Sequence, residues 1–193
     1  MGSSDEADNG GKFVIRRLLE ERTVRVFGPV DAAMTKRVIS ELLLLEADDP
    51  DAQITIVQNS PGGSVSDGFA IYDTIRFIRP EVRVLNVGMC ASIATVILLG
   101  APKEQRLSLP HTRFLIHQPL IAGNVYGPAS DLEITAREIL KMRDRINQML
   151  ADETGQPLDR VVKDTQRDYW MDAAAALEYG LISEIVEHRQ ELK

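Results

Sequence analysis

A serine at the start of an apolar segment is the residue of this chain best suited to chemistry. Residues 87–101 read VGMCASIATVILLGA, so Ser92 follows a small-residue turn and precedes a run typical of a buried helix. Burying an unpaired hydroxyl costs on the order of 1 to 3 kcal/mol. Ser92 therefore either caps this helix, a position that serine favours, or is a nucleophile whose oxyanion is stabilised by backbone N–H groups and the helix dipole. The spacing alone leaves both interpretations open.

A nucleophilic serine needs a general base, and the chain has three histidines to supply one. His188 lies in the polar C-terminal tail, and His111 follows a proline in an expected turn. His117 differs because it ends the apolar run RFLI. A lone histidine at a strand end is more often structural than catalytic. A triad also needs a carboxylate to orient the histidine, and the pattern does not single one out among the 29 acidic residues.

The segment NSPGG, residues 59–63, is the second candidate site. Two glycines after a proline permit backbone torsions that other residues avoid. Their N–H groups would then line a concave anion site. A plain tight turn is the simpler interpretation.

Several common sites are absent from the sequence. It has neither a G-x-x-x-x-G-K-[ST] loop nor a G-x-G-x-x-G after a strand. It also lacks Cys/His pairs at zinc spacing and a D-x-D-x-D loop for calcium. We therefore expect no metal and no cofactor in this chain. The surroundings of Ser92 are not G-x-S-x-G, which disfavours an α/β-hydrolase.

Composition narrows the class of protein. The 22 basic and 29 acidic residues give a net charge of -7 without a basic cluster interleaved with aromatics, so nucleic acid is not an expected partner. The 193 residues, 44% of them hydrophobic, suit one globular domain. The single cysteine, Cys90, and an N-terminus without a secretory core predict a cytoplasmic protein. The apolar run at 87–101 is shorter than the roughly 20 residues that cross a bilayer.

Strand-like and helix-like segments alternate through the first half of the chain. This order favours βαβ units with right-handed crossovers around a mostly parallel sheet. Loops beyond the strand ends are then the natural place for a site. The strands are expected at 23–28, 52–58 and 82–88, and the helices at 31–49, 66–78 and 91–101, with Asp31 as an N-cap and Pro50 as a stop.

The second half is dominated by one long helix. Strand-like runs at 105–109 and 113–119 precede residues 121–129, which read as an extended flap or an edge strand. Ser130 and Glu133 stand in capping-box spacing. The helix that follows, about 23 residues and roughly 35 Å long, is expected to project and to need a partner subunit for its apolar stripe. That stripe comprises Leu132, Ile139, Met142, Ile146 and Met149. A short helix at 159–164, the segment 168–180 and a last strand at 181–187 close the chain.

Five segments, taken together and in order, resemble the proteolytic subunit of Clp protease, the ClpP family. The resemblance runs from about Leu18 to about Glu187. It implies a crotonase-like α/β head built of βαβ units, with a protruding handle at about 119–153 made of a long helix and an extended flap. Residues 13–193 would form the single protease domain, after a disordered acidic segment at 1–12. The segments are NSPGGSVSDGFAIYDTIRFI, GMCASIATVILL, PHTRFLIHQP, SDLEITAREILKMRDRINQML and TGQPLDRVVKDTQRDYWMDAAAALEYGLI.

The resemblance assigns roles to five residues. Ser92 would attack the scissile carbonyl, and His117 would take its proton as general base. Asp168, in RDYWM, would hold the imidazole in the required tautomer. The backbone N–H groups of Gly63 and Ile93 would form the oxyanion hole. The implied activity is a serine endopeptidase that cuts unfolded polypeptides to short peptides, with an apolar bias.

The resemblance also implies an assembly. Family members stack two seven-subunit rings around the active sites, and a AAA+ Clp ATPase such as ClpX, ClpA or ClpC unfolds the substrate and threads it in. ATP would then be used by the partner ATPase and not by this chain, which agrees with the missing P-loop. No nucleic acid and no membrane are expected among its partners.

The chain departs from the family in three places. Many members carry tyrosines in the strand before NSPGG, in the groove that docks the ATPase, whereas Thr55 and Val57 stand in that strand here. The N-terminal segment is acidic and Gly-rich, and Pro128 replaces a common glutamine. One hypothesis is a mixed complex in which a paralogous subunit docks the ATPase. Two other functions are weighed beside the protease, namely a scaffolding ring subunit without catalysis and a crotonase-type acyl-CoA enzyme, whose catalytic glutamates have no evident place in this sequence.

Overall fold

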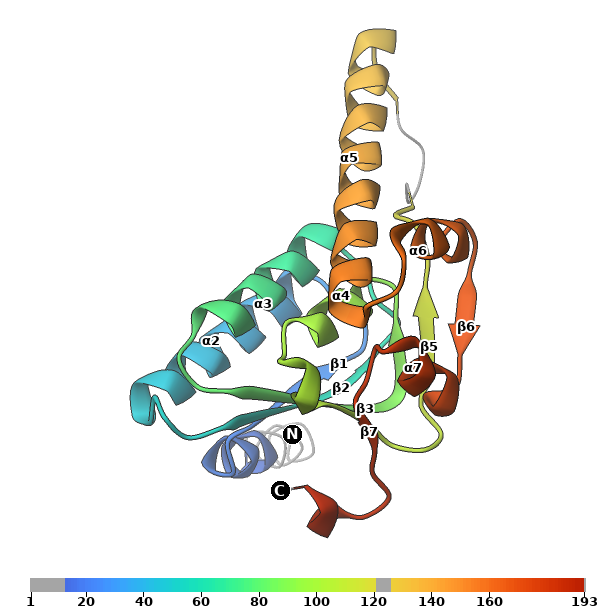
Figure 1. Cartoon of the computed structure of the whole chain (residues 1–193). Helices are drawn as coiled ribbons and strands as arrows, with labels where there is room; N and C mark the ends of the chain where they lie inside the picture. The colour runs from blue at the N-terminus through green and yellow to red at the C-terminus, as the bar shows by residue number, and fades with distance from the viewer. Residues whose placement is uncertain (1–12, 121–125, 193) are drawn as a thin grey trace, which may run out of the picture.

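A largely parallel β-sheet forms the centre of the structure (Figure 1). The computed structural model describes residues 13–120 and 126–192. The strand order is β1-β2-β3-β4-β7, and β5 pairs with the C-terminal half of β3 and with β6. Among the described residues, the paired strands run parallel except β5 with β6. The expectation of a mostly parallel sheet is therefore confirmed. The strands are β1 Thr23–Phe27, β2 Ile54–Ser60, β3 Val82–Ala91, β4 Arg106–Ser108, β5 Arg113–Ile116, β6 Tyr169–Met171 and β7 Glu184–Ile185.

Three helices, α2, α3 and α4, pack on one face of this sheet, and α5 rises from the head (Figure 1). A further helical segment, residues 13–20, precedes β1. The predicted alternation of strands and helices through the first half is thus confirmed. The labelled helices are α2 Ala32–Asp48, α3 Val65–Phe77, α4 Ile93–Leu99, α5 Ala129–Thr154, α6 Leu158–Asp164 and α7 Ala173–Tyr179, and short 3-10 turns occur at Lys103–Gln105 and Arg189–Glu191.

Helix α2 begins and ends as its sequence indicates. The Asp31 side chain accepts a hydrogen bond of 2.8 Å from the backbone N–H of Met34, which makes it the expected N-cap. Val38, Leu42 and Leu45 recur at helical spacing and are buried against the sheet. One apolar stripe therefore fixes which face of α2 turns inward.

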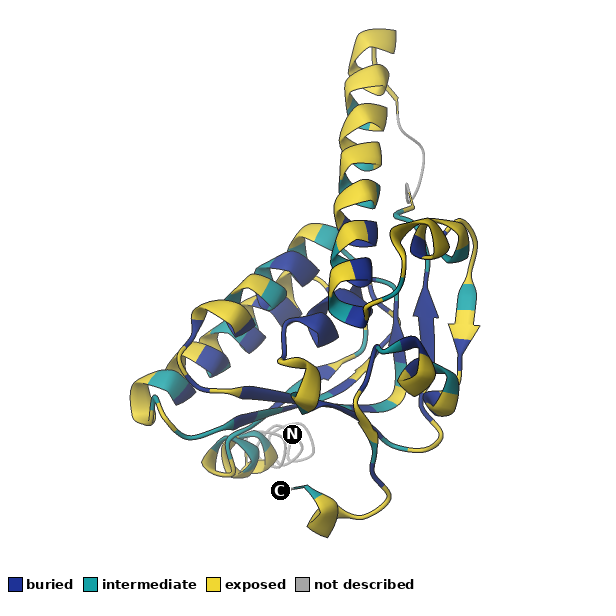
Figure 2. Cartoon of the chain, viewed as in Figure 1, coloured by how far each residue is buried: buried dark blue, intermediate teal, exposed yellow. Residues whose placement is uncertain are grey.

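Helix α4 is the most deeply buried helix of the head (Figure 2). All seven of its residues are buried. It contacts α3, α5, β3 and β5, so it has no solvent-facing side. A helix that is apolar all round belongs in a core. This burial fixes the position of whatever stands at its N-terminus.

Helix α5 is 26 residues long, slightly longer than the sequence predicts. Its buried residues all lie in the last turns, and its outer turns are exposed (Figure 2). The capping-box prediction is wrong, because Ser130 lies inside the first turn and the N-cap position belongs to Pro128, which makes no side-chain cap bond. Proline pre-organises a helix start, so the helix begins before Ser130. Gly155 ends it in the left-handed conformation.

Two expectations concern segments that the structure describes only in part or not at all. The predicted disorder of residues 1–12 and most of the flap at 121–129 lie outside the described residues. Residues 126–128, which are described, form no strand.

At the C-terminal side, the segment 168–180 divides into β6 and α7 and ends at Gly180 in the left-handed conformation. The last predicted strand shortens to β7.

Candidate active site

The turn between β3 and α4 holds Ser92 in an unusual backbone conformation. Its φ of 57° and ψ of −127° lie in a region that non-glycine residues rarely adopt. Such strain costs on the order of 1–3 kcal/mol and persists only where the surroundings impose it. Here the Ser92 N–H donates to Leu115 O at 2.9 Å, and the Ser92 carbonyl accepts from Thr95 N and Thr95 Oγ1. The turn is therefore held from both sides.

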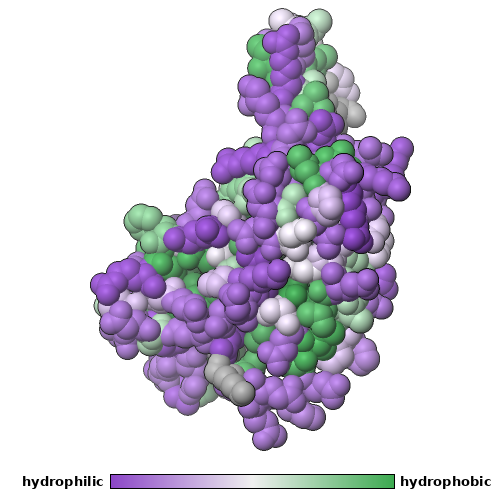
Figure 3. Space-filling model, in the orientation of Figure 1, coloured by the Kyte–Doolittle hydropathy of each residue, from purple (hydrophilic) through white to green (hydrophobic). Residues whose placement is uncertain are grey.

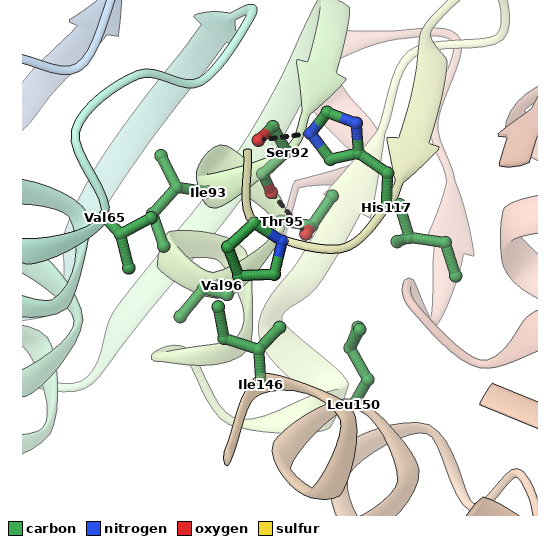
Figure 4. Close-up of a pocket in the computed structure, with 10 residues that line it drawn as sticks. Val65, Ser92, Ile93, Thr95, Val96, His117, Ile146 and Leu150 are labelled. Carbon is green, nitrogen blue, oxygen red and sulfur yellow. Dashed lines mark hydrogen bonds between the residues drawn. The ribbon is translucent and has the colours of Figure 1, made fainter. Parts of the chain in front are cut away.

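The Ser92 side chain does not cap the helix, although the residue occupies the N-cap position of α4. Its Oγ lies instead 2.8 Å from His117 Nε2 (Figure 4). The capping interpretation of this side chain is therefore wrong. The alternative left open by the sequence, a hydroxyl directed at a base, describes the geometry.

His117 lies between the serine and a carboxylate. It follows the last residue of β5, and its Nδ1 is 3.0 Å from Asp168 Oδ1. The His117 side chain is 13% exposed, whereas that of Asp168 is 63% exposed. When Nδ1–H donates to the carboxylate, Nε2 is left as an acceptor for the Ser92 hydroxyl hydrogen. The three side chains thus form a continuous hydrogen-bonded chain.

Strand pairing explains why Asp168 reaches His117. In the antiparallel pair of β5 with β6, Ile116 stands opposite Tyr169. The next position of this register places His117 opposite Asp168. Just beyond, Gln118 N donates to Thr165 O at 2.7 Å and ties the two chain segments together.

The NSPGG turn packs directly on the serine turn. A Cβ built on Gly62 would come within 2.7 Å of Ser92 Cβ and of Ala91 O, so only glycine fits there. Gly63 forms a parallel bridge with Val30 in which Val30 N donates to Gly62 O and Ser64 N donates to Val30 O. This pattern leaves the Gly63 N–H outside the bridge.

The second candidate oxyanion donor begins a helix. Ile93 is the first residue of α4, and an N–H at that position has no acceptor within its own helix. Ile93 also contacts the neighbouring helix closely, since a Cβ built on Gly68 of α3 would meet Ile93 Cγ1 at 2.2 Å. The structure therefore brings the Gly62–Gly63 segment and the start of α4 together beside Ser92.

An apolar pocket opens beside the serine and the histidine (Figure 4). Ile146 and Leu150, from the inner end of α5, form one of its walls. The prediction that Ile146 belongs to an apolar stripe covered by a partner subunit is wrong, because Ile146 is buried within the head. The sequence patterns did not identify Leu150 as a pocket residue. Its spacing of four residues from Ile146 could have done so, because it places both side chains on the same face of the helix. The other apolar walls come from Val65, Ile93, Val96, Ile116 and Pro119.

The thiol of Cys90, two residues before Ser92, is not a second candidate nucleophile. Cys90 is fully buried, and this burial raises the pKa of its thiol well above the usual range. A thiol that stays protonated is a poor nucleophile.

Within residues 13–120 and 126–192, no group of three or more His, Cys, Asp or Glu side chains is arranged to hold a metal ion. In the same ranges, no helix is both long and apolar enough to cross a membrane.

Comparison with known proteins gives a consistent result. The family model described as Clp protease matches residues 7–189. A protein of Rhizobium etli, named ATP-dependent Clp protease proteolytic subunit 3, is 44% identical over 182 residues. A protein of the same name from Rhizobium johnstonii is 46% identical over 182 residues. Both alignments cover 94% of this chain and 92% of the relative.

Proposed function

The chain belongs to the Clp protease family, and on that premise we propose that Ser92, His117 and Asp168 form the catalytic triad of a serine endopeptidase. The chain is a peptidase of the Clp system. One observation supports the assignment of the triad above all others. The distances of 2.8 Å from Ser92 Oγ to His117 Nε2 and 3.0 Å from His117 Nδ1 to Asp168 Oδ1 suit the two proton contacts that such a triad needs.

The proposed reaction follows from these contacts. Ser92 Oγ attacks the carbonyl carbon of the scissile peptide while its proton passes to His117 Nε2. Asp168 stabilises the imidazolium that forms. The same proton then passes to the leaving amine as the C–N bond breaks. Water, deprotonated by His117, then attacks the acyl carbon. The bond between that carbon and Ser92 Oγ breaks, the proton returns from His117 to Oγ, and the peptide leaves as a carboxylic acid.

The oxyanion of each tetrahedral intermediate needs donors that are already in place. We assign the Gly63 and Ile93 backbone N–H groups to this role. The support is the close packing of the glycine turn on Ser92 together with the position of Ile93 at the first turn of α4. Donors fixed in this way act without reorganisation during the reaction. The reaction needs no cofactor in this chain.

The substrate is unfolded polypeptide in this proposal, with an apolar side chain beside the scissile bond. The apolar pocket next to Ser92 supports the second point, because it excludes water and presents branched aliphatic walls. The proposed mechanism recognises no further residues of the substrate, so the products are short peptides of varied composition.

As a Clp protease proteolytic subunit, the chain works in a complex with an ATPase. We propose two stacked seven-subunit rings in the cytoplasm, fed by a AAA+ Clp ATPase such as ClpX, ClpA or ClpC. Exposed apolar side chains on the outer half of α5 support contacts between subunits, and Figure 3 shows apolar surface there among polar residues. Their exposed fractions are 39% for Leu132, 59% for Ile134 and 47% for Leu140.

In this proposal the ATPase docks on a mixed complex, which contains this chain and a paralogous subunit. Thr55 and Val57 on β2 are small and half-buried, so they offer little of the aromatic surface expected of a docking groove. A paralogous subunit would provide that surface. The purified chain is therefore expected neither to stimulate a Clp ATPase nor to be stimulated by it. Mutual stimulation in the absence of any paralogue would contradict this part of the proposal.

Labelling with a fluorophosphonate tests the triad directly. The expected result is one covalent adduct per chain, located on Ser92 by peptide mass spectrometry. The Ser92→Ala variant is the matched control and is expected to carry no adduct. A scaffolding subunit or an acyl-CoA enzyme would leave Ser92 unlabelled. Absence of an adduct in the folded, assembled protein would therefore overturn the proposed function.

A further inference from the structure

A fully buried glutamine stands in the middle of the parallel sheet. Gln58 lies on β2, on the same face as the buried residues Ile54 and Ile56, and its exposed fraction is 0%. Core-facing positions of a strand are normally apolar. A buried amide at such a position needs hydrogen-bond partners, and its presence in the second strand of the sheet calls for a physical reason.

The Gln58 amide nitrogen faces three acceptors. Nε2 lies 3.0 Å from Asn86 Oδ1 on β3, 3.1 Å from Cys90 Sγ and 3.0 Å from the Ala94 carbonyl in α4. The amide oxygen is buried and has no hydrogen-bond partner. Turning the amide over would set that oxygen against two other oxygens, so the network fixes its orientation.

The unpaired oxygen makes stability a poor explanation for Gln58. A buried acceptor without a donor destabilises a fold, and an apolar side chain of the same size would avoid that loss. Natural sequences break such rules mainly at functional sites. The partners of Gln58 lie on both sides of the candidate nucleophile, because Cys90 is two residues before Ser92 and Ala94 is two residues after it.

Asn86 extends the contact toward the strand that carries the base. Its Nδ2 donates to Leu107 O on β4 at 2.9 Å. Its own backbone carbonyl accepts from Leu109 N and from Thr112 Oγ1, each at 3.0 Å. Thr112 immediately precedes β5, and β5 leads to His117. Gln58 and Asn86, called the Gln58–Asn86 clamp below, thus connect the first turn of α4 with the start of β5.

We propose that Gln58 is a positioning residue that sets the Ser92 turn relative to His117 through the Gln58–Asn86 clamp. The inference rests on the proposed function, because it concerns the alignment of that triad. Ser92 holds a backbone conformation that its neighbours must impose. Gln58 supplies one such restraint through its hydrogen bond to the Ala94 carbonyl. It does so without touching substrate or the reacting atoms.

The Gln58→Met variant tests the clamp, because methionine keeps the length and apolar volume of the side chain and removes its donors. Saturation kinetics of fluorophosphonate labelling separate the maximal rate of Ser92 modification from the apparent affinity for the probe. The maximal rate is expected to fall by about tenfold or more, because small misplacements of a reacting group cost that much. The apparent affinity is expected to stay within about twofold, since the apolar pocket is untouched.

Ile56→Val is the matched control. It removes one methyl group from the same face of the same strand, two residues from Gln58, and leaves every hydrogen-bonding group of the clamp in place. Both variants are assayed below their unfolding temperatures, as measured by thermal denaturation. Ile56→Val is expected to label at the parental rate. A Gln58→Met protein that labels at the parental rate, within about twofold, would overturn the proposal.

A second variant keeps the test informative if Gln58→Met does not fold. Gln58→Glu preserves the shape, and a buried, protonated carboxyl retains one donor hydrogen. Its maximal labelling rate is expected to lie between those of the parent and of Gln58→Met, or below the parent where only Gln58→Glu folds. A parental rate in Gln58→Glu, when it alone folds, would count against the clamp. Failure of the parent itself to label would instead refute the proposed function, so the two failures are distinguishable.

Discussion

Helices α4 and α5 pack side by side, yet they are stabilised in different ways. Every residue of α4 is buried, so its position is set by the elements around it. Only the inner end of α5 is buried, and its outer turns carry ion pairs along their own surface, such as Glu133 with Arg137 and Glu138 with Lys141. Such pairs stabilise a helix by only a few tenths of a kcal/mol each. The proposed nucleophile, Ser92, thus directly precedes the helix that is buried all round, whereas α5 extends into solvent and exposes the surface of its outer turns.

Removing the proposed nucleophile tests the buried region around α4 most strongly. Ser92→Ala is expected to lower the peptide turnover number by about 10⁶-fold, because no other group in the triad can attack the carbonyl. Peptidase assays measure the loss, and thermal denaturation serves as the control for folding. Substantial residual turnover that survives repurification would mean that another residue is the nucleophile.

Changing the orienting carboxylate has the next largest effect. Asp168→Asn is expected to lower turnover by about 10⁴-fold, because the amide favours the imidazole tautomer with its proton on the wrong nitrogen. The fold is expected to persist, since the Asp168 side chain is 63% exposed. Circular dichroism and peptidase assays check both points. Near-normal turnover would show that the carboxylate was wrongly assigned.

Two leucines of α5, one buried at its inner end and one exposed near its middle, allow a matched test of the comparison. Leu150 is 1% exposed and lies at the inner end, where it also lines the apolar pocket. Leu150→Ala is expected to lower the free energy of unfolding by about 2–5 kcal/mol, through lost burial and the cavity left behind. Urea denaturation followed by circular dichroism gives the value. A loss below about 1 kcal/mol would mean that the inner end of α5 is loosely packed.

The outer leucine is expected to have the smallest effect on the isolated chain. Leu140, 47% exposed, loses little burial when shortened, so Leu140→Ala is expected to change the free energy of unfolding by less than about 0.5 kcal/mol. Its effect should emerge in assembly, measured by native mass spectrometry as a shift toward smaller oligomers. Equal destabilisation by Leu140→Ala and Leu150→Ala in dilute protein would remove the distinction between the exposed and the buried part of the helix.

Local patterns predicted the head of the molecule well. The alternation in β1, the stripe and N-cap of α2 and the sequence around Ser92 all depend on near neighbours in the chain, so they can be read from short windows. The apolar residues after Ser92 correctly indicated a buried helix. Sequence alone did not decide whether the hydroxyl capped that helix, because the position of His117 relative to Ser92 is set by the pairing of β5 with β3.

Features that depend on tertiary pairing were not predictable from local patterns. Only the family resemblance selected Asp168, because a three-residue antiparallel strand gives no periodic signal. The helix start at Pro128 was missed, since Ser130 and Glu133 match a capping box that the structure does not form. Gln58 reads as the ordinary polar end of a strand. Its burial follows from the way β2, β3 and α4 meet, which no window of sequence contains.

The length of α5 has a mechanical consequence. A continuous helix of 26 residues is a stiff rod about 39 Å long. Its inner end carries Ile146 and Leu150, which form a wall of the apolar pocket beside Ser92. If α5 moves as a rigid body, a tilt of its outer end would also displace that wall. The width of the pocket would then depend on what the outer turns of α5 contact.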